Sequence, residues 1–185
     1  SHFANSNGLD EPGHVMSVRD LATLARRIIQ EFPEFYPIYS EREYTFAGIK
    51  QKNRNPLLQA GVPGVDGMKT GYTTQAGYGL VTSAQRGDQR LILVITGLPS
   101  LKVRGAEAAR LLEYGFREFQ EYSVFKPGQV VREADVWFGE QPKVPLVAAD
   151  TVAVTLSREA RKGMVVKLFY DNPAPAPIIK DQPMG

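Results

Sequence analysis

The 185-residue sequence has no cysteine, only two histidines and a single tryptophan. The absence of cysteine excludes disulfide bonds and thiol chemistry. His2 and His14 do not have the His-x-x-x-His spacing of a metal site, so we expect no metal and no cofactor. A Ser-His-Asp hydrolase is disfavoured as well, because the sequence has no Gly-x-Ser-x-Gly turn and few histidines that could act as the base.

The sequence also lacks an excess of charge of either sign and lacks long apolar runs. The 22 basic and 20 acidic residues give a net charge of +2, which disfavours nucleic acid as a partner. No apolar run reaches 18 residues, and the first residues do not have the pattern of a signal peptide. With 43% hydrophobic and 23% charged residues, the composition is typical of a folded globular chain.

The first two thirds of the chain alternate between helical and strand patterns. Ser17 begins a capping-box pattern that is followed by apolar residues at helical spacing, which predicts a helix over residues 17–31. A short hairpin is expected near residues 43–49. Further along, we expect two strands at 77–85 and 90–97, joined by a turn at 86–88, and a helix at 101–119 that packs on their sheet. This is the pattern of an α+β fold.

The pattern changes to short β segments near residue 120, and we place a domain boundary there. The predicted division is residues 1–119 and residues 120–185, with the second domain all-β and incomplete. Its expected strands include residues 164–170. The Pro-rich residues 172–177 are compatible either with an extended linker or with a turn and strand of the β domain.

The most informative motif is Lys69-Thr70-Gly71, which lies within residues 65–73 and precedes a small, apolar run at residues 75–84. On a strand, Lys69 and Gly71 share one face and Thr70 points to the other. At an exposed edge, Gly71 lets a ligand or another backbone come close, and Lys69 supplies a compact charge for a carboxylate. The motif therefore predicts a carboxylate-binding wall. With these residues as its first strand, the sheet becomes a three-stranded antiparallel meander.

The triplet and its flanks resemble the third signature of penicillin-binding proteins and serine β-lactamases, and specifically the low-molecular-mass D-alanyl-D-alanine carboxypeptidases. Segments that recur in that family in the same order extend the resemblance over residues 1–119; they are residues 1–5, 8–10, 17–20, 34–36, 53–55 and 57–58. The resemblance implies the C-terminal part of a penicillin-binding/β-lactamase-like transpeptidase domain, an antiparallel sheet with packed helices, followed by a small β domain.

The resemblance also implies roles for six residues. Lys69 matches the lysine that holds the substrate carboxylate and assists proton transfer around the nucleophile, Thr70 would hydrogen-bond that carboxylate, and Gly71 would let the substrate lie along the strand. The remaining three matches are the oxyanion-hole backbone N–H of Tyr72, the carboxylate-binding Arg104 and a loop arginine, Arg54. For Arg54 the alternative is an ion pair that fixes the loop, and for the Tyr72 ring it is packing.

The nucleophile of the family is missing from these residues. Its Ser-x-x-Lys and Ser-x-Asn motifs lie upstream of the matching segments, and the one Ser-x-x-Lys here, Ser123 to Lys126, follows the Lys-Thr-Gly and runs into a Pro-Gly turn. We therefore expect a fragment that is inactive alone. Exposed sheet edges and apolar faces would favour self-association of such a fragment.

For the intact parent, the resemblance implies a serine-type carboxypeptidase that removes terminal D-alanine from peptidoglycan stem peptides through an acyl-enzyme and is inhibited by β-lactams. It also implies a periplasmic or cell-surface location. A membrane segment outside these residues is left open. The alternatives are a β-lactamase or transpeptidase of the same superfamily, and a peptidoglycan-binding module without catalysis.

Overall fold

The computed structural model describes residues 1–184 and divides the chain into two compact units, Ser1–Arg117 and Glu118–Gly185. No helix of the described residues is both long and apolar enough to cross a membrane.

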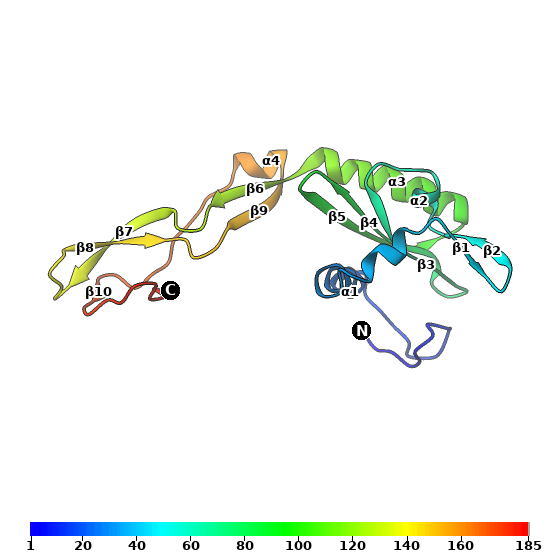
Figure 1. Ribbon diagram of the computed structural model, residues 1–185, viewed down its shortest axis with the longest axis horizontal. Coiled ribbons are helices and arrows are strands. Elements are labelled where there is room, and N and C mark those ends of the chain that lie inside the picture. The colour runs from blue at the N-terminus through cyan, green and yellow to red at the C-terminus, as the bar shows by residue number, and fades with distance from the viewer. Residues whose placement is uncertain (185) are drawn as a thin grey trace. The chain divides into compact units, whose positions relative to one another are not determined.

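The first unit contains helices around a three-stranded antiparallel sheet (Figure 1). Its elements in chain order are α1 (Val18–Glu31), the 3₁₀ helix η1 (Tyr36–Ser40), β1 (Glu43–Phe46), β2 (Ile49–Lys52), α2 (Pro56–Gln59), β3 (Val65–Thr73), β4 (Gly77–Arg86), β5 (Gln89–Leu98) and α3 (Leu101–Glu118). The order β3-β4-β5 leaves β3 at an edge of its sheet, and β1 pairs only with β2. The expected helices, hairpin and meander are therefore present.

Helix α1 begins as its sequence predicts. The Ser17 Oγ accepts a hydrogen bond from the Asp20 backbone N–H at 3.1 Å, which satisfies one of the free donors of the first turn. Its apolar side faces the sheet, where Ala25 is buried with Tyr36 of η1 and Met68 of β3. This cluster holds the N-terminal helix and η1 against the strand that carries the Lys-Thr-Gly motif.

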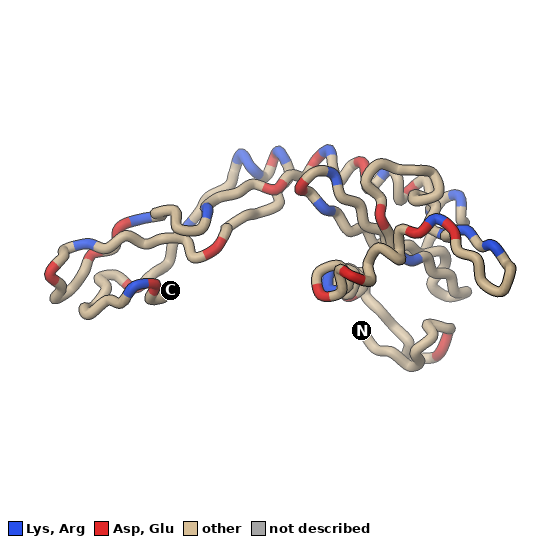
Figure 2. Tube along the Cα trace, in the orientation of Figure 1, with Lys and Arg blue, Asp and Glu red and all other residues tan. Residues whose placement is uncertain are grey.

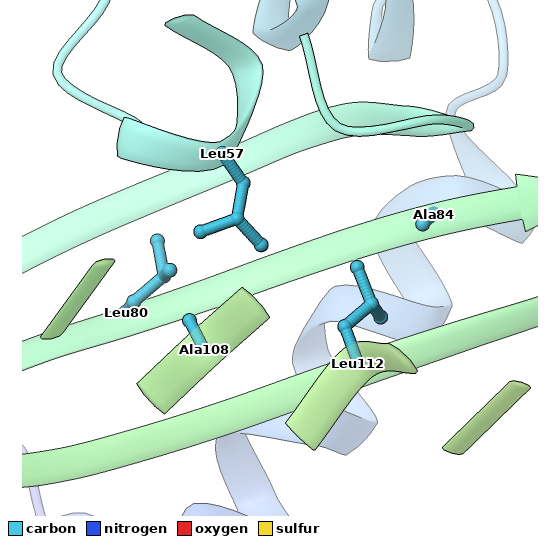
Figure 3. Close-up of a cluster of buried hydrophobic side chains, with 5 residues drawn as sticks. All are labelled: Leu57, Leu80, Ala84, Ala108 and Leu112. Atoms are coloured by element: carbon cyan, nitrogen blue, oxygen red, sulfur yellow. The ribbon is translucent and has the colours of Figure 1, made fainter. Parts of the chain in front are cut away.

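Helix α3 covers the opposite face of the sheet from α1 (Figure 1). The buried residues that it shares with the sheet and α2 form one cluster (Figure 3); they are Leu57, Leu80, Ala84, Ala108 and Leu112. Leu80 and Ala84 lie on the same face of β4 because side chains alternate along a strand. Helices therefore pack on both faces of this sheet.

The second unit consists of short strand pairs. β6 pairs with β9 and β7 with β8, both antiparallel, and β10 pairs in parallel with the other edge of β7. Its elements are β6 (Phe119–Phe125), β7 (Val130–Trp137), β8 (Lys143–Val147), β9 (Val152–Ser157), α4 (Arg158–Lys162) and β10 (Ala174–Pro175). The Pro-rich segment contributes β10, in agreement with the strand interpretation rather than with a linker. The prediction of a strand at residues 164–170 is wrong, because these residues have no regular secondary structure.

Candidate functional site

The candidate site is a cavity of about 390 Å³ on the α1 side of the sheet, along the edge strand β3. Its walls come from α1, from residues 68–73 of β3 and from the facing parts of β4 and β5. Most of the lining is apolar or glycine, and among the described residues Lys69 is the only one with a charged side chain that lines the cavity. An anion that enters this cavity therefore meets one cation against mostly apolar walls.

Lys69 is exposed, and its ammonium group is not paired with any carboxylate of the described residues. Its Nζ donates a hydrogen bond to the carbonyl oxygen of the next residue, Thr70, at 2.8 Å. This contact holds the ammonium close to the strand and leaves two of its three donors for a ligand. The arrangement suits a compact cation that meets an external carboxylate at the sheet edge.

Gly71 leaves open space beside the strand. A Cβ placed on Gly71 would have no atom within 4 Å, although Gly71 lies directly opposite Gly79 of β4. Elsewhere on β3 the packing is tight: a Cβ on Gly67 would come within 2.9 Å of the Tyr36 hydroxyl oxygen. The strand is therefore packed closely at its start and accessible at its Lys-Thr-Gly end.

Thr70 and Tyr72 also line the cavity, but they differ in exposure. Thr70 is buried, with 8% of its surface exposed, whereas Tyr72 is 59% exposed. The Tyr72 ring packs against Tyr78 of β4, with ring centroids 4.4 Å apart. The ring thus has a packing partner, as the alternative interpretation of Tyr72 supposed, while its backbone remains part of the open edge strand.

Arg104 does not line this cavity. It is 5% exposed on α3, where its Nη1 donates to the Gly79 carbonyl oxygen at 3.4 Å and its guanidinium lies 5.9 Å from the Tyr78 ring centroid. Its Nε has no hydrogen-bond partner among the described residues. Burial lowers the pKa of Arg104 below its ordinary value, and Tyr78 partly opposes this shift. A buried cation without a carboxylate is unfavourable, so this position is suited to an anionic partner.

Arg54 lies between two asparagines that fix the local backbone. Asn55 is 1% exposed; its Oδ1 accepts from the Leu57 N–H at 3.0 Å, and its Nδ2 donates to the Gly67 carbonyl oxygen at 2.8 Å. The Asn53 Oδ1 in turn accepts a hydrogen bond from the Asn55 backbone N–H at 2.9 Å. Arg54 itself is exposed and does not line the cavity.

A polar network at the start of β3 was not predicted from the sequence. Asp66 accepts from the Tyr36 hydroxyl at 2.8 Å and from the Arg90 guanidinium at 2.7 Å, and Arg90 also donates to the Ser83 hydroxyl. Burial is the main cause that raises the pKa of Tyr36 above its ordinary value, and the neighbouring Asp66 adds to it. The network ties β3 to β4, β5 and η1. The one signal in the sequence was an aspartate three residues before Lys69.

The Ser-x-x-Lys of the sequence lies in the other unit. Ser123 is on β6 and Lys126 follows directly after that strand. The register of β6 against β9 shifts between Ser123 and Phe125, and Lys126 lies beyond the strand, so the two residues do not share one regular element. Among residues 1–184, no hydrogen bond joins the Ser123 hydroxyl to Lys126.

Comparison with known families agrees with this geometry. The family described as D-alanyl-D-alanine carboxypeptidase matches residues 1–100, which is more than half of the chain. The chain belongs to this family. The C-terminal domain of penicillin-binding protein 5 matches residues 119–185. The family that the sequence resembles and the expected α+β class are both confirmed.

Two of the relatives match nearly the whole chain. D-alanyl-D-alanine carboxypeptidase DacC of Escherichia coli is 41% identical over 184 residues, which are 99% of this chain and 46% of the relative. Penicillin-binding protein 5 of Haemophilus influenzae has the same fold with a TM-score of 0.83 at 39% identity, over 96% of this chain and 52% of that one. The chain thus spans about half the length of these relatives.

A third relative was solved with a β-lactam. Penicillin-binding protein D2 of Listeria monocytogenes, in its ampicillin-bound form, is 34% identical, with a TM-score of 0.54 over 59% of this chain and 46% of that one.

Proposed function

We propose that the first unit forms the Lys-Thr-Gly wall of a serine D-alanyl-D-alanine carboxypeptidase active site. The observation that carries this proposal is the single cation Lys69 on an open edge strand, beside the empty space at Gly71. A peptide that lies antiparallel to β3 would place its C-terminal carboxylate near Lys69 and Thr70. Family membership supports the substrate class that we propose, a peptidoglycan stem peptide that ends in D-Ala-D-Ala.

The proposed reaction has two steps. A serine hydroxyl attacks the carbonyl carbon of the terminal peptide bond, the C–N bond breaks, and D-alanine leaves with the proton. Water then hydrolyses the acyl-enzyme and regenerates the serine. In this scheme Lys69 holds the carboxylate and assists the proton transfer, and the Tyr72 backbone N–H stabilises the developing oxyanion.

Arg104 and Arg54 take different parts in the proposal. The Nε of the buried Arg104 has no hydrogen-bond partner among the described residues, which supports a role in attracting the substrate carboxylate. Arg54 is exposed next to the asparagine that holds the Gly67 carbonyl, and we assign it to the rim of the site. β-Lactams carry a carboxylate as well and would acylate the same serine. Such a protein would work in the periplasm or at the cell surface, where peptidoglycan lies.

A fluorescent penicillin tests this function. We expect the product of the full gene to form a covalent adduct, detected by gel fluorescence and intact mass, and the 185-residue chain to form none. The reason is that the one Ser-x-x-Lys of this chain spans the end of β6 in the second unit. If neither protein is labelled, the proposal gives way to a peptidoglycan-binding module without catalysis. Label on the 185-residue chain would show that it carries a nucleophile of its own.

Gly71→Val offers a test of the open strand edge. Because a Cβ at Gly71 meets no atom within 4 Å, we expect the variant to fold, with a change in the free energy of unfolding below about 1 kcal/mol. The added side chain would occupy the space in which the substrate lies, so penicillin acylation of the full gene product should fall by about tenfold or more. Stopped-flow measurement of the acylation rate constant tests this fall. A normal rate in the folded variant would exclude close approach of the ligand at Gly71.

A further inference from the structure

The second unit contains a basic groove that the proposed function does not use. The groove has a volume of about 500 Å³ and is lined by Gln120, Tyr122, Arg158, Arg161 and Lys162. Three of these five side chains are cations and none is acidic. The whole chain has a net charge of only +2, so this concentration of one sign is local. The basic residues of α4 are marked in blue in Figure 2.

Local structure gathers the three cations on one side of a single turn. The Ser157 Oγ accepts from the Ala160 N–H at 3.1 Å and thereby starts α4. Arg158, Arg161 and Lys162 then have the spacing i, i+3 and i+4, which puts them on the same helix face. Like charges at this spacing repel one another, so the arrangement costs stability unless an anion lies between them.

Pairing within the unit leaves two of the cations available. Lys162 forms an ion pair with Glu159 at 3.0 Å, but Arg158 and Arg161 have no carboxylate partner among residues 1–184. In the first unit, by contrast, Arg27 and Arg110 each pair with a glutamate on their own helix. Both free guanidinium groups border the groove.

Arg161 is oriented by an aromatic ring. Its guanidinium carbon lies 4.2 Å from the centroid of the Tyr122 ring. Tyr122 is fixed on β6, opposite Val154 of β9, and its hydroxyl donates to Gln120 Oε1 at 3.3 Å. A guanidinium that is stacked by its face keeps its N–H edge free for hydrogen bonds, which lowers the entropy lost when a ligand binds.

We propose that this groove binds a phosphate monoester. Three cations less the one carboxylate of Glu159 leave a local charge of +2, which matches the charge of about −1.5 to −2 that a phosphate monoester carries at neutral pH. A ligand with a single carboxylate would neutralise only half of this local charge of +2. Two arginine forks can also hold several phosphate oxygens at once. The monoester belongs either to a soluble metabolite or to a lipid headgroup.

The test uses the 185-residue chain and two probes at low ionic strength. Glycerol 3-phosphate is titrated by calorimetry, and vesicles of phosphatidylcholine with phosphatidic acid are compared in sedimentation with vesicles of phosphatidylcholine alone. We expect binding to at least one probe, weakened by added salt because the contacts are ionic. Binding to glycerol 3-phosphate but not to the vesicles identifies a soluble ligand, and the reverse identifies a lipid headgroup.

Two double variants decide whether the groove is responsible. Arg158→Gln with Arg161→Gln should lower the affinity about tenfold or more, because charge-assisted hydrogen bonds are lost. The control, Lys126→Gln with Arg132→Gln, removes the same charge from exposed positions of the same unit that do not line the groove. The affinity of the control variant should stay within about twofold of that of the unmodified chain. All four residues are exposed, and circular dichroism checks that both variants fold. An equal loss in the control, or no binding to either probe, overturns the proposal.

Discussion

Lys69→Ala in the full gene product should slow acylation by penicillin by roughly 10² to 10³, the size of effect seen when one electrostatic stabiliser is removed from an acyl-transfer site. The structural reason is that, within residues 1–184, Lys69 is the only charged side chain that lines the cavity. No neighbouring cation can replace it there, since Arg104 and Arg54 lie outside the lining. The measurement is the second-order acylation rate constant, followed by fluorescence or intact mass.

Lys102→Ala is the matched control for this loss of charge. Lys102 is also an exposed lysine of the first unit, but it lies on α3 and does not line the cavity. Penicillin should acylate the control variant at the normal rate. Both variants should have the same free energy of unfolding as the unmodified protein, since an exposed lysine without an ion pair contributes little to stability. If Lys69→Ala acylates as fast as Lys102→Ala, the cavity beside β3 is not the carboxylate site.

The placement of Lys69 and Gly71 was predictable from the sequence because it depends on local rules. Strand alternation puts both residues on one side of β3, and the structure shows them at an edge of the sheet, as the motif indicated. Helix α1 was predictable for the same reason, since Ser17 and the apolar spacing after it are short-range signals. The catalytic roles of these residues remain predictions.

Other features depend on contacts that no local pattern reveals. Asn55, Gly67 and Thr82 meet across 12 and 15 residues of sequence, and their hydrogen bonds follow from the way α2 docks on the sheet. Helix α4 has five residues and no apolar periodicity, so only its Ser157 cap could have signalled it. The apolar residues 164–170 suggested a strand, but a strand also needs a partner in a sheet. β7 already has a neighbour on each side, β8 and β10, so it offers no free edge to these residues.

Asn55→Ala should destabilise the first unit by about 2 to 3 kcal/mol, the sum of a lost helix cap and one lost buried hydrogen bond. Asn55 is 1% exposed and connects the start of α2 with the Gly67 carbonyl, two residues before Lys69. Its removal leaves the buried Leu57 N–H without the acceptor that caps the turn. Urea unfolding measures the loss, and hydrogen exchange at the Leu57 amide localises it.

Gln59→Ala is the control on the same short helix. The Gln59 side chain is exposed and donates one hydrogen bond, to the Arg42 carbonyl oxygen at 2.9 Å. Since water can replace that bond, the expected loss is below about 0.5 kcal/mol. Equal losses for the two variants would mean that Asn55 contributes only as an ordinary polar residue and does not hold β3.

The Gly67 carbonyl oxygen makes a sharper test possible, because it also accepts a hydrogen bond from the Thr82 Oγ1 at 2.6 Å. Either donor alone still satisfies that oxygen. Thr82→Val by itself should therefore lower the free energy of unfolding less than Asn55→Ala, which also removes the cap of α2. Removing both donors leaves a buried carbonyl unpaired, and we expect the double variant to lose about 1 kcal/mol or more beyond the sum of the single variants. Simple additivity would show that the oxygen finds another donor. Excess loss would show that Asn55 and Thr82 together fix the strand on which Lys69 is carried.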